Sequence, residues 1–355
     1  MNIVDMHCDT ISALLAAKRE GRMEETLRQN HLHIDLEKMK RGGYLLQNFA
    51  LFIHMPDQED PFEEALRMAD LYEQELAGSR DLIRPAYCYA DIERNRREGL
   101  MSAVLTVEEG GVCKGDPVYL RTLYRLGVRM LTLTWNFPNE LGWPNLEQPG
   151  TQTIGTEPSE TLRSGRAQPM DGKADFVPDL RKVNAVQGLT ETGIEFIREM
   201  ERLGMIVDVS HLSDKGFWDV ERTLSGPFVA SHSDARAVCN CCRNLSDEMI
   251  RALAQKGGVT GLNFCAAFLE EPEKRGARAT ISSIVGHAKH IVKVGGEDCL
   301  GLGSDFDGIG THDELPDASC MPLMAEALLK GGFTERQVDK IMGGNVLRLY
   351  REVLN

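Results

Sequence analysis

One stretch shows the pattern that decides the fold: Arg202-Leu203-Gly204-Met205-Ile206-Val207-Asp208-Val209-Ser210-His211. Apolar residues recur at three- and four-residue steps from Thr190 to Leu203, which predicts an amphipathic helix. Gly204 is typical of the residue that ends a helix, and the apolar run Met205 to Val209 predicts the strand that follows. A histidine, His211, stands where this strand ends.

Strand and helix patterns alternate along the whole chain. Helical patterns such as Phe62 to Leu76 and Val118 to Leu126 lie between short apolar runs, and each can return as a right-handed crossover. We therefore predict a single (β/α)8 TIM barrel that spans residues 1–355. The predicted strands are Ile3 to Val4, Leu45 to Leu51, Ala103 to Val107, Met130 to Leu133, Met205 to Val209, Phe228 to Ala230, Val259 to Phe264 and Leu300 to Leu302.

One segment interrupts the alternation. Residues Asn136 to Val186 are long for a connection and rich in proline, glycine, threonine and charge. Because this loop follows the fourth predicted strand, we expect it to lie over the face where the strands end. The alternative is a solvated insertion that touches nothing, since long loops are either functional or merely tolerated.

The composition of the chain argues against nucleic acids and membranes as partners. The chain has 54 acidic and 40 basic side chains, a formal net charge of −14, which repels phosphate backbones and anionic membranes. No run approaches the roughly 18 apolar residues of a membrane span, and no signal-peptide pattern precedes the first strand. The odd number of cysteines and the crowding of Cys239, Cys241 and Cys242 do not suggest a disulfide framework. We expect a cytoplasmic protein without nucleic-acid or membrane partners.

Histidine and acidic residues follow several of the predicted strands. In a parallel barrel the carboxyl ends of all strands converge on one face, so these side chains can meet there. His7 and Asp9 are two residues apart and share one side of an extended strand, where both can reach one metal ion. Such a pair is more often a structural hydrogen bond, but its place at a strand end favours the metal.

Glu108 and two further histidines extend this set. A carboxylate at Glu108 can bridge two metals, although Glu109 competes because a shift of one residue reverses the side of the strand. The pair could also be a solvated charged loop. His211 and His232 follow consecutive strands, and two neutral imidazoles suit a second zinc ion. Water held between two such metals loses a proton near neutral pH, and the hydroxide can attack a carbonyl.

Asp305 follows the last predicted strand, next to the first strand of the barrel. There it could take a proton from the metal-bound water and pass it to a leaving nitrogen. Asp307 is the rival for this role. The glycines of the surrounding run, Gly301 to Gly308, also permit a plain turn.

With these residues assembled, the chain resembles the membrane (renal) dipeptidase family of binuclear zinc peptidases, within the amidohydrolase-like barrels. The similarity runs nearly from end to end, and the order of the motifs makes it specific. The matching stretches are Asp5-Met6-His7-Cys8-Asp9, Glu108 with Gly110-Gly111, Leu123 to Gly127, Leu131-Thr132-Leu133-Thr134, Arg202 to His211, Ser231-His232-Ser233, Arg243-Asn244, Gly303 to Gly308, and a tail from Leu315-Pro316-Asp317 to Gly343-Gly344-Asn345.

The resemblance implies roles for individual residues. His7 and Asp9 would bind one zinc ion, His211 and His232 would bind the other, and Glu108 would bridge them. Asp305 matches the acid/base aspartate. Arg243 matches the arginine that holds the carboxylate of the substrate, a task that suits a bidentate guanidinium.

Two departures from the family concern the substrate and the membrane. Mammalian members carry a histidine that contacts the substrate after the Leu-Thr-Leu-Thr strand, where this chain has Trp135, which offers one indole N–H donor and cannot accept a proton. We expect Trp135 and the adjacent Asn136 to contact the substrate. The signal peptide and lipid-anchor tail of animal members have no counterpart here, so membrane attachment is not carried over.

The sequence thus predicts a metal-dependent hydrolase, a dipeptidase with two Zn²⁺ per chain that acts on L-L and L-D dipeptides through a metal-bridging hydroxide. A symmetric homodimer is the default assembly. The nearest alternative is a deacylase or lactonase on the same barrel, but the His-x-Asp of His7 and Asp9 and the lack of a lysine on the fourth strand argue against it. A noncatalytic metal- or peptide-binding relative would have no reason to keep Asp305. A purely structural role is the remaining alternative.

Overall fold

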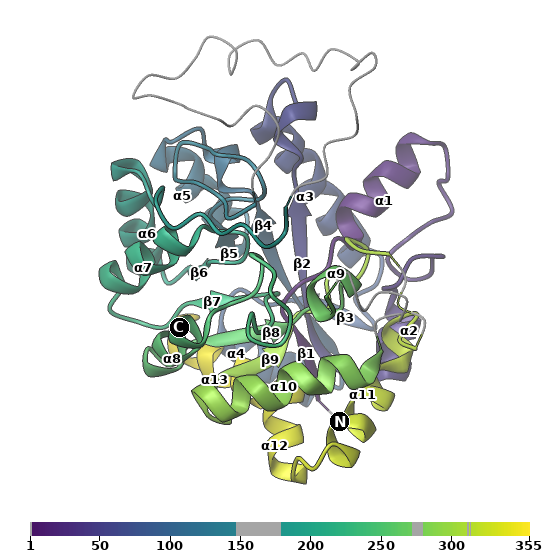
Figure 1. The fold of residues 1–355 in the computed structure, drawn as a ribbon. Helices are drawn as coiled ribbons and strands as arrows, with labels where there is room; N and C mark the ends of the chain where they lie inside the picture. Colours follow the sequence, from purple (N-terminus) through teal and green to yellow (C-terminus); the bar gives the residue numbers. More distant parts are fainter. Residues whose placement is uncertain (1, 147–178, 272–279, 311, 313) are drawn as a thin grey trace, which may run out of the picture.

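Parallel strands form a closed barrel that helices surround (Figure 1). The computed structural model describes residues 2–146, 179–271, 280–310, 312 and 314–355. Within these residues the strand order is β2-β1-β9-β8-β7-β6-β5-β4-β3, and β2 also pairs with β4, which closes a barrel of eight strands. The barrel strands are β1 (Ile3–Asp5), β2 (Tyr44–Phe52), β4 (Met101–Glu108), β5 (Val128–Thr132), β6 (Ile206–Asp208), β7 (Val229–Ala230), β8 (Val259–Leu262) and β9 (Leu300–Leu302).

All the predicted runs form barrel strands, so the predicted (β/α)8 fold is confirmed. The sequence analysis missed β3 (Ile83–Pro85), which pairs with the beginning of β4. Three residues that end in a proline are too short to show a strand period.

The helices lie outside the barrel or at its ends. The predicted helices are confirmed as α3 (Pro61–Ala77), α5 (Pro117–Arg125) and α6 (Glu191–Leu203). Gly204 ends α6 with a φ of 71°, in the left-handed conformation that favours glycine. The other helices are α1 (Thr10–Arg19), α2 (Leu36–Gly42), α4 (Tyr89–Arg97), α7 (Asp214–Thr223), α8 (Asp247–Gln255), α9 (Ala266–Leu269), α10 (Ile281–Gly295), α11 (Met321–Lys330), α12 (Glu335–Asp339) and α13 (Asn345–Val353), with short 3₁₀ or π turns at Met55–Asp57, Gly110–Cys113, Ala318–Cys320 and Lys340–Gly344.

The C-terminal helix α13 closes one end of the barrel. Its residues Val346, Leu349 and Tyr350 are buried against an apolar layer inside the barrel, and the Tyr350 hydroxyl donates to Asn48 Oδ1 at 2.8 Å. Because this layer lies in the amino-terminal parts of the strands, the carboxyl ends stay available for a site. The layer consists of Val4, Leu46, Val104, Met130, Ile206, Val229 and Val259.

The register places four residues at one level of the barrel mouth. Glu108 pairs with Phe52 of β2 and with Thr132 of β5, and Thr132 pairs with Asp208 of β6. Each of the four lies an even number of residues after a member of the interior layer on its own strand, so their side chains share the interior face.

The loop that interrupts the alternation meets the site side of the barrel at both described ends. The Asn145 side chain donates to Asp214 Oδ1 and to the carbonyl of Cys242, and Asn184 N donates to Asn145 Oδ1. Both ends therefore pack on the segments that follow β6 and β7. Residues 147–178 of the loop lie outside the described residues.

Two further expectations can be compared with the structure. The nine cysteines, all within the described residues, are free of disulfide bonds. Among the described helices, none has the length and apolar character needed to cross a membrane.

Candidate metal centre at the carboxyl ends of the strands

The structure brings six of the predicted site residues together in what we call the carboxylate–histidine cluster. Each lies at or just after the carboxyl end of one of five barrel strands, with His7 and Asp9 both following β1, and each is at most 9% exposed. The shared level of the strand ends explains why residues so far apart in sequence meet. The members are His7, Asp9, Glu108, His211, His232 and Asp305.

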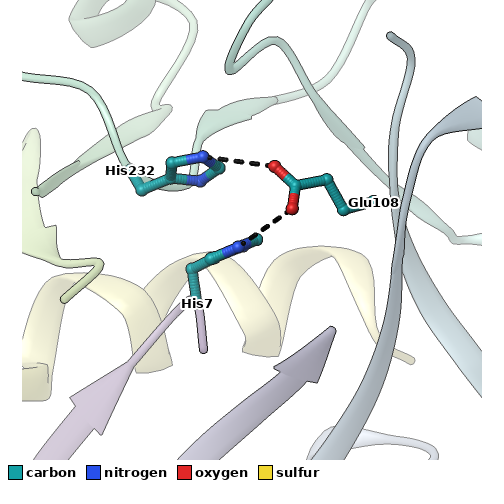
Figure 2. A group of neighbouring side chains, drawn as sticks. All are labelled: His7, Glu108 and His232. Carbon is teal, nitrogen blue, oxygen red and sulfur yellow. Dashed lines mark ion pairs between the residues drawn. The ribbon is translucent and has the colours of Figure 1, made fainter. Parts of the chain in front are cut away.

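Glu108 lies at the centre of the cluster and faces three histidines. Its Oε1 atom is 3.1 Å from His211 Nε2 and 3.4 Å from His232 Nε2. Its Oε2 atom is 3.4 Å from His7 Nε2. Figure 2 shows the two oxygens directed toward the rings of His232 and His7. Glu108 can therefore offer one oxygen to each of two ions.

The remaining acidic members surround His7. Its Nε2 atom is 3.6 Å from Asp9 Oδ2 and 3.9 Å from Asp305 Oδ1. The potential ligand atoms of His7, Asp9 and Asp305 lie within 4.8 Å of one another, as do those of His7, Glu108 and His232. His232 is thus close to both other histidines, with ring centroids 3.9 Å from His7 and 5.1 Å from His211.

Hydrogen bonds at Nδ1, on the side of the ring away from Glu108, fix the tautomers of His211 and His232. His211 Nδ1 is 2.7 Å from Asn136 Oδ1, an acceptor, so Nδ1 carries the proton. His232 Nδ1 is 2.8 Å from Ser231 Oγ, which already donates its own proton to Asp208 Oδ2. Both Nε2 atoms therefore present lone pairs toward Glu108.

These lone pairs make the cluster suitable for a cation. The Nε2 atoms of His211 and His232 are 3.0 Å apart, where two lone pairs repel unless a positive charge lies between or beside them. His7 Nδ1 and Nε2 and Asp9 Oδ1 are buried without a hydrogen-bond partner. Buried polar atoms are normally satisfied, and imidazole with carboxylate is a donor set that divalent zinc accepts. The residues present therefore fit a metal centre.

The pKa values of Glu108, His211 and His232 agree with this donor set. Burial lowers the pKa of His7, but the carboxylates of Glu108 and Asp9 hold it well above its usual range. Burial raises the pKa of Glu108, but His7, His211 and His232 hold it well below its usual range, so this carboxylate is ionised. Burial, with the charge of Arg243, lowers the pKa of His211 to about 4, and burial lowers the pKa of His232 well below its usual range. Two neutral imidazoles and a carboxylate are the forms that bind a metal.

Glu109 and Asp307, the alternatives to Glu108 and Asp305, lie outside the cluster. Both accept hydrogen bonds from neighbouring segments. Glu109, with a φ of 117°, accepts hydrogen bonds from Gly111 N, Trp135 N and the Asn139 side chain. Asp307 accepts from Thr10 Oγ1 and from His33 N, each at 2.6 Å. The structure thus places Glu108 and Asp305, rather than Glu109 and Asp307, among the histidines.

Two members of the cluster have strained backbones. His211 has a φ of 69° and Asp305 a φ of 62°, in the left-handed region that is costly for residues other than glycine. Asn263 Nδ2 holds Asp305 Oδ2 at 2.9 Å. Gly308 packs so closely that a Cβ atom there would lie 2.0 Å from Asp9 Oδ2.

Two fully buried aspartates support the cluster, and the sequence analysis missed both roles. Asp5 accepts from Ser304 N and Oγ at 3.0 and 2.6 Å. Asp208 accepts from Ser231 N and Oγ at 2.8 and 2.5 Å. Each aspartate therefore fastens a strand end to the segment that follows a neighbouring strand. An acidic residue inside an otherwise apolar run was the available signal, because a buried charge requires several donors.

Arg243 lies beside the cluster as a buried cation. It is 3% exposed, its Nη1 and Nη2 atoms are 3.4 Å from Ser233 Oγ and from the carbonyl of His232, and its Nε has no hydrogen-bond partner. Among the described residues no carboxylate forms an ion pair with it. A buried guanidinium without a counterion can bind an anionic group of a ligand.

Trp135 and Asn136 both lie beside His211. The Trp135 ring centroid is 6.0 Å from that of His211, and the Asn136 side chain holds the His211 ring as described above. The expectation that both residues contact a substrate stays a prediction.

Comparison with known proteins gives a consistent result over the whole chain. The sequence profile of the membrane dipeptidase family, peptidase family M19, matches residues 1–158 and 171–355. An uncharacterized protein in the pqqA 5' region of Klebsiella pneumoniae is 33% identical over 83% of this chain and 97% of its own length. The dipeptidase tcpJ of Claviceps purpurea is 30% identical over 90% of this chain and 69% of its own length.

Solved structures agree with this match. A metallopeptidase named dipeptidase AC superposes with a TM-score of 0.83 at 26% identity, over 100% of this chain and 99% of its own. A metallopeptidase from Rhodobacter sphaeroides, solved with a phosphinate mimic of the dipeptide L-Ala-D-Ala, has a TM-score of 0.82 at 26% identity, with the same coverage.

The contact between Asn136 and His211 generates a prediction about metal affinity. Asn136→Leu removes the acceptor that orients the ring, and loss of such a partner lowers metal affinity about 10- to 100-fold. Asn136→Asp keeps an acceptor and should bind zinc within a few-fold of the unchanged protein. Competition with a chromophoric chelator measures both. Zinc binding by the leucine variant as tight as that of the unchanged protein would remove this role of Asn136.

Proposed function

The chain belongs to the membrane dipeptidase family of metallopeptidases, and from this membership we propose that it is a zinc-dependent dipeptidase acting on L-L and L-D dipeptides. The observation that carries the proposal is the carboxylate–histidine cluster, in which the buried carboxylate of Glu108 faces the Nε2 lone pairs of His211 and His232 at 3.1 and 3.4 Å. The L-Ala-D-Ala mimic bound by the Rhodobacter sphaeroides relative supports the tolerance of a D-residue.

Five residues of the cluster would hold two zinc ions. His7 and Asp9 are assigned to one ion, His211 and His232 to the other, and Glu108 to both, because its two oxygens face different histidines. When bound, zinc polarises a carbonyl group and lowers the pKa of water.

The chain's own residues would bind the substrate and move its protons. Hydrolysis adds a hydroxyl group to the carbonyl carbon and a proton to the departing amine nitrogen. Asp305 is placed for that proton: Asn263 holds one of its oxygens, and the other lies 3.9 Å from His7 Nε2, beside the cluster. Arg243 is placed to bind the C-terminal carboxylate with two parallel hydrogen bonds.

A short substrate with a free C-terminal carboxylate fits this arrangement. Arg243 Nη2 is 3.4 Å from the carbonyl of His232, so the carboxylate it binds must lie close to the cluster. A dipeptide places its peptide bond one residue away from that carboxylate, whereas an acetylated amino acid lacks the free amine.

A cytoplasmic location, a symmetric homodimer and action as a single domain also stay predictions.

Amino-acid release from zinc-loaded protein tests the proposed function. We expect cleavage of L-L and L-D dipeptides that a chelator abolishes and added zinc restores, because removing the ions removes the groups that polarise the carbonyl. Tripeptides and acetylated amino acids serve as controls and should be left intact. Release from acetylated amino acids or lactones, with dipeptides untouched, would instead support a deacylase or lactonase.

Asp305→Asn separates proton transfer from metal binding. The amide keeps the shape and the contact with Asn263 but cannot exchange a proton, so kcat should fall about 100-fold or more. Metal content, measured by mass spectrometry, should stay that of the unchanged protein. Loss of metal together with activity would show that Asp305 is a ligand rather than the acid/base.

Arg243→Ala tests the carboxylate contact. Loss of a charge-assisted, bidentate pair should raise KM for Ala-Ala about tenfold or more. Alanyl-alanine amide has no carboxylate, so its cleavage by the two proteins should differ much less. Equal losses on the free acid and on the amide would contradict the assignment.

A further inference from the structure

Four half-buried aromatic side chains line one side of the barrel mouth. Phe52 and His54 come from the end of β2 and the segment after it, and Trp135 and Phe137 from the segment after β5. Ring centroids are 5.0 Å apart for Phe52 and Trp135, 5.4 Å for His54 with each of Trp135 and Phe137, and 5.8 Å for Trp135 and Phe137. These residues are called the aromatic wall.

The aromatic wall adjoins the carboxylate–histidine cluster. Phe52 pairs with Glu108 in the β2–β4 register, and paired residues of neighbouring parallel strands point to the same face. Trp135 extends this side toward His211, with ring centroids 6.0 Å apart. The wall is thus continuous with the cluster, and its rings keep part of their surface accessible.

Phe52 of the wall and Arg243 lie on opposite sides of the mouth, whereas Trp135 and Phe137 follow β5, two strands from β7. In the closed order of the barrel, β2 is four strands from β7 in both directions. Arg243 contacts the carbonyl of His232, just after β7, whereas Phe52 ends β2. The cluster occupies the space between them. A dipeptide whose carboxylate lies at Arg243 and whose peptide bond lies over the cluster would direct its N-terminal residue across the mouth toward Phe52, against which Trp135 packs.

We infer that the aromatic wall receives the N-terminal side chain of the substrate and that the enzyme prefers dipeptides with a large apolar or aromatic N-terminal residue. This inference rests on the proposed dipeptidase function and names the substrate class for it. Edge-to-face ring contacts and burial of apolar surface stabilise such a side chain there.

The few polar groups of the aromatic wall also favour an apolar or aromatic N-terminal side chain. The Trp135 indole offers one N–H donor, and His54 is the member with a polar ring, held by Asp57 through Nδ1 and Oδ2 at 2.7 Å. An aspartate side chain placed against these rings would lose water and face the negative π surfaces of the rings in return.

The test compares kcat/KM for dipeptides that differ at one end. Phe-Ala and Leu-Ala should exceed Ala-Ala by about tenfold or more, and Asp-Ala should be cleaved no faster than Ala-Ala. Ala-Phe carries the same atoms in the other order and should lack the advantage of Phe-Ala. Equal values for Phe-Ala and Ala-Ala, or a preference for Ala-Phe, would overturn the inference while leaving the dipeptidase function intact.

Variants of the aromatic wall test whether its side chains cause the preference for a large apolar N-terminal residue. Trp135→Ala should lower the ratio of Phe-Ala to Ala-Ala cleavage about tenfold, and Trp135→Phe, which keeps a ring, should retain most of it. Phe137→Ala should also lower the ratio and serves as an independent variant if Trp135→Ala does not fold. An unchanged ratio in folded Trp135→Ala and Phe137→Ala proteins would overturn the inference. Absence of hydrolysis of every dipeptide by zinc-loaded, unchanged protein would instead overturn the proposed function.

Discussion

The arrangement of the barrel mouth depends on one electrostatic constraint: a buried carboxylate, Glu108, faces three histidine rings, and the Nε2 lone pairs of His211 and His232 point toward it. Such a group of acceptors is unfavourable in the protein interior unless a cation balances it. Asn136 and Ser231 direct the protons of His211 and His232 outward, away from Glu108. The pKa of Glu108 is held low and those of His211 and His232 are lowered, so the cluster has the protonation states of a metal centre.

Interactions elsewhere in the barrel keep the strand ends that carry the cluster in fixed positions. Helix α13 fills the other end of the barrel, so the interior is packed up to the level of Glu108. Asp5 and Asp208 each join neighbouring segments through a serine. These contacts help to stabilise the left-handed backbones of His211 and Asp305, which would cost about 1–3 kcal/mol each if unsupported.

Much of this organisation was predictable from the sequence. The strands were visible because parallel barrel strands are buried on both faces and appear as continuous apolar runs. The ligand candidates were visible because they follow those runs. The rest depends on tertiary partners that are distant in sequence: the contact of Asn136 with His211, 75 residues apart, has no local signal. The register that places Phe52 beside Glu108 likewise appears only when β2 and β4 pair across the closed barrel.

Anomalous diffraction from crystals of zinc-loaded protein tests whether two ions share Glu108. Data collected just above and just below the zinc absorption edge locate the ions without reference to activity. We expect two anomalous peaks, one beside His7 and Asp9 and one beside His211 and His232, each about 2.0–2.2 Å from an oxygen of Glu108. A single peak, or two peaks away from Glu108, would contradict it.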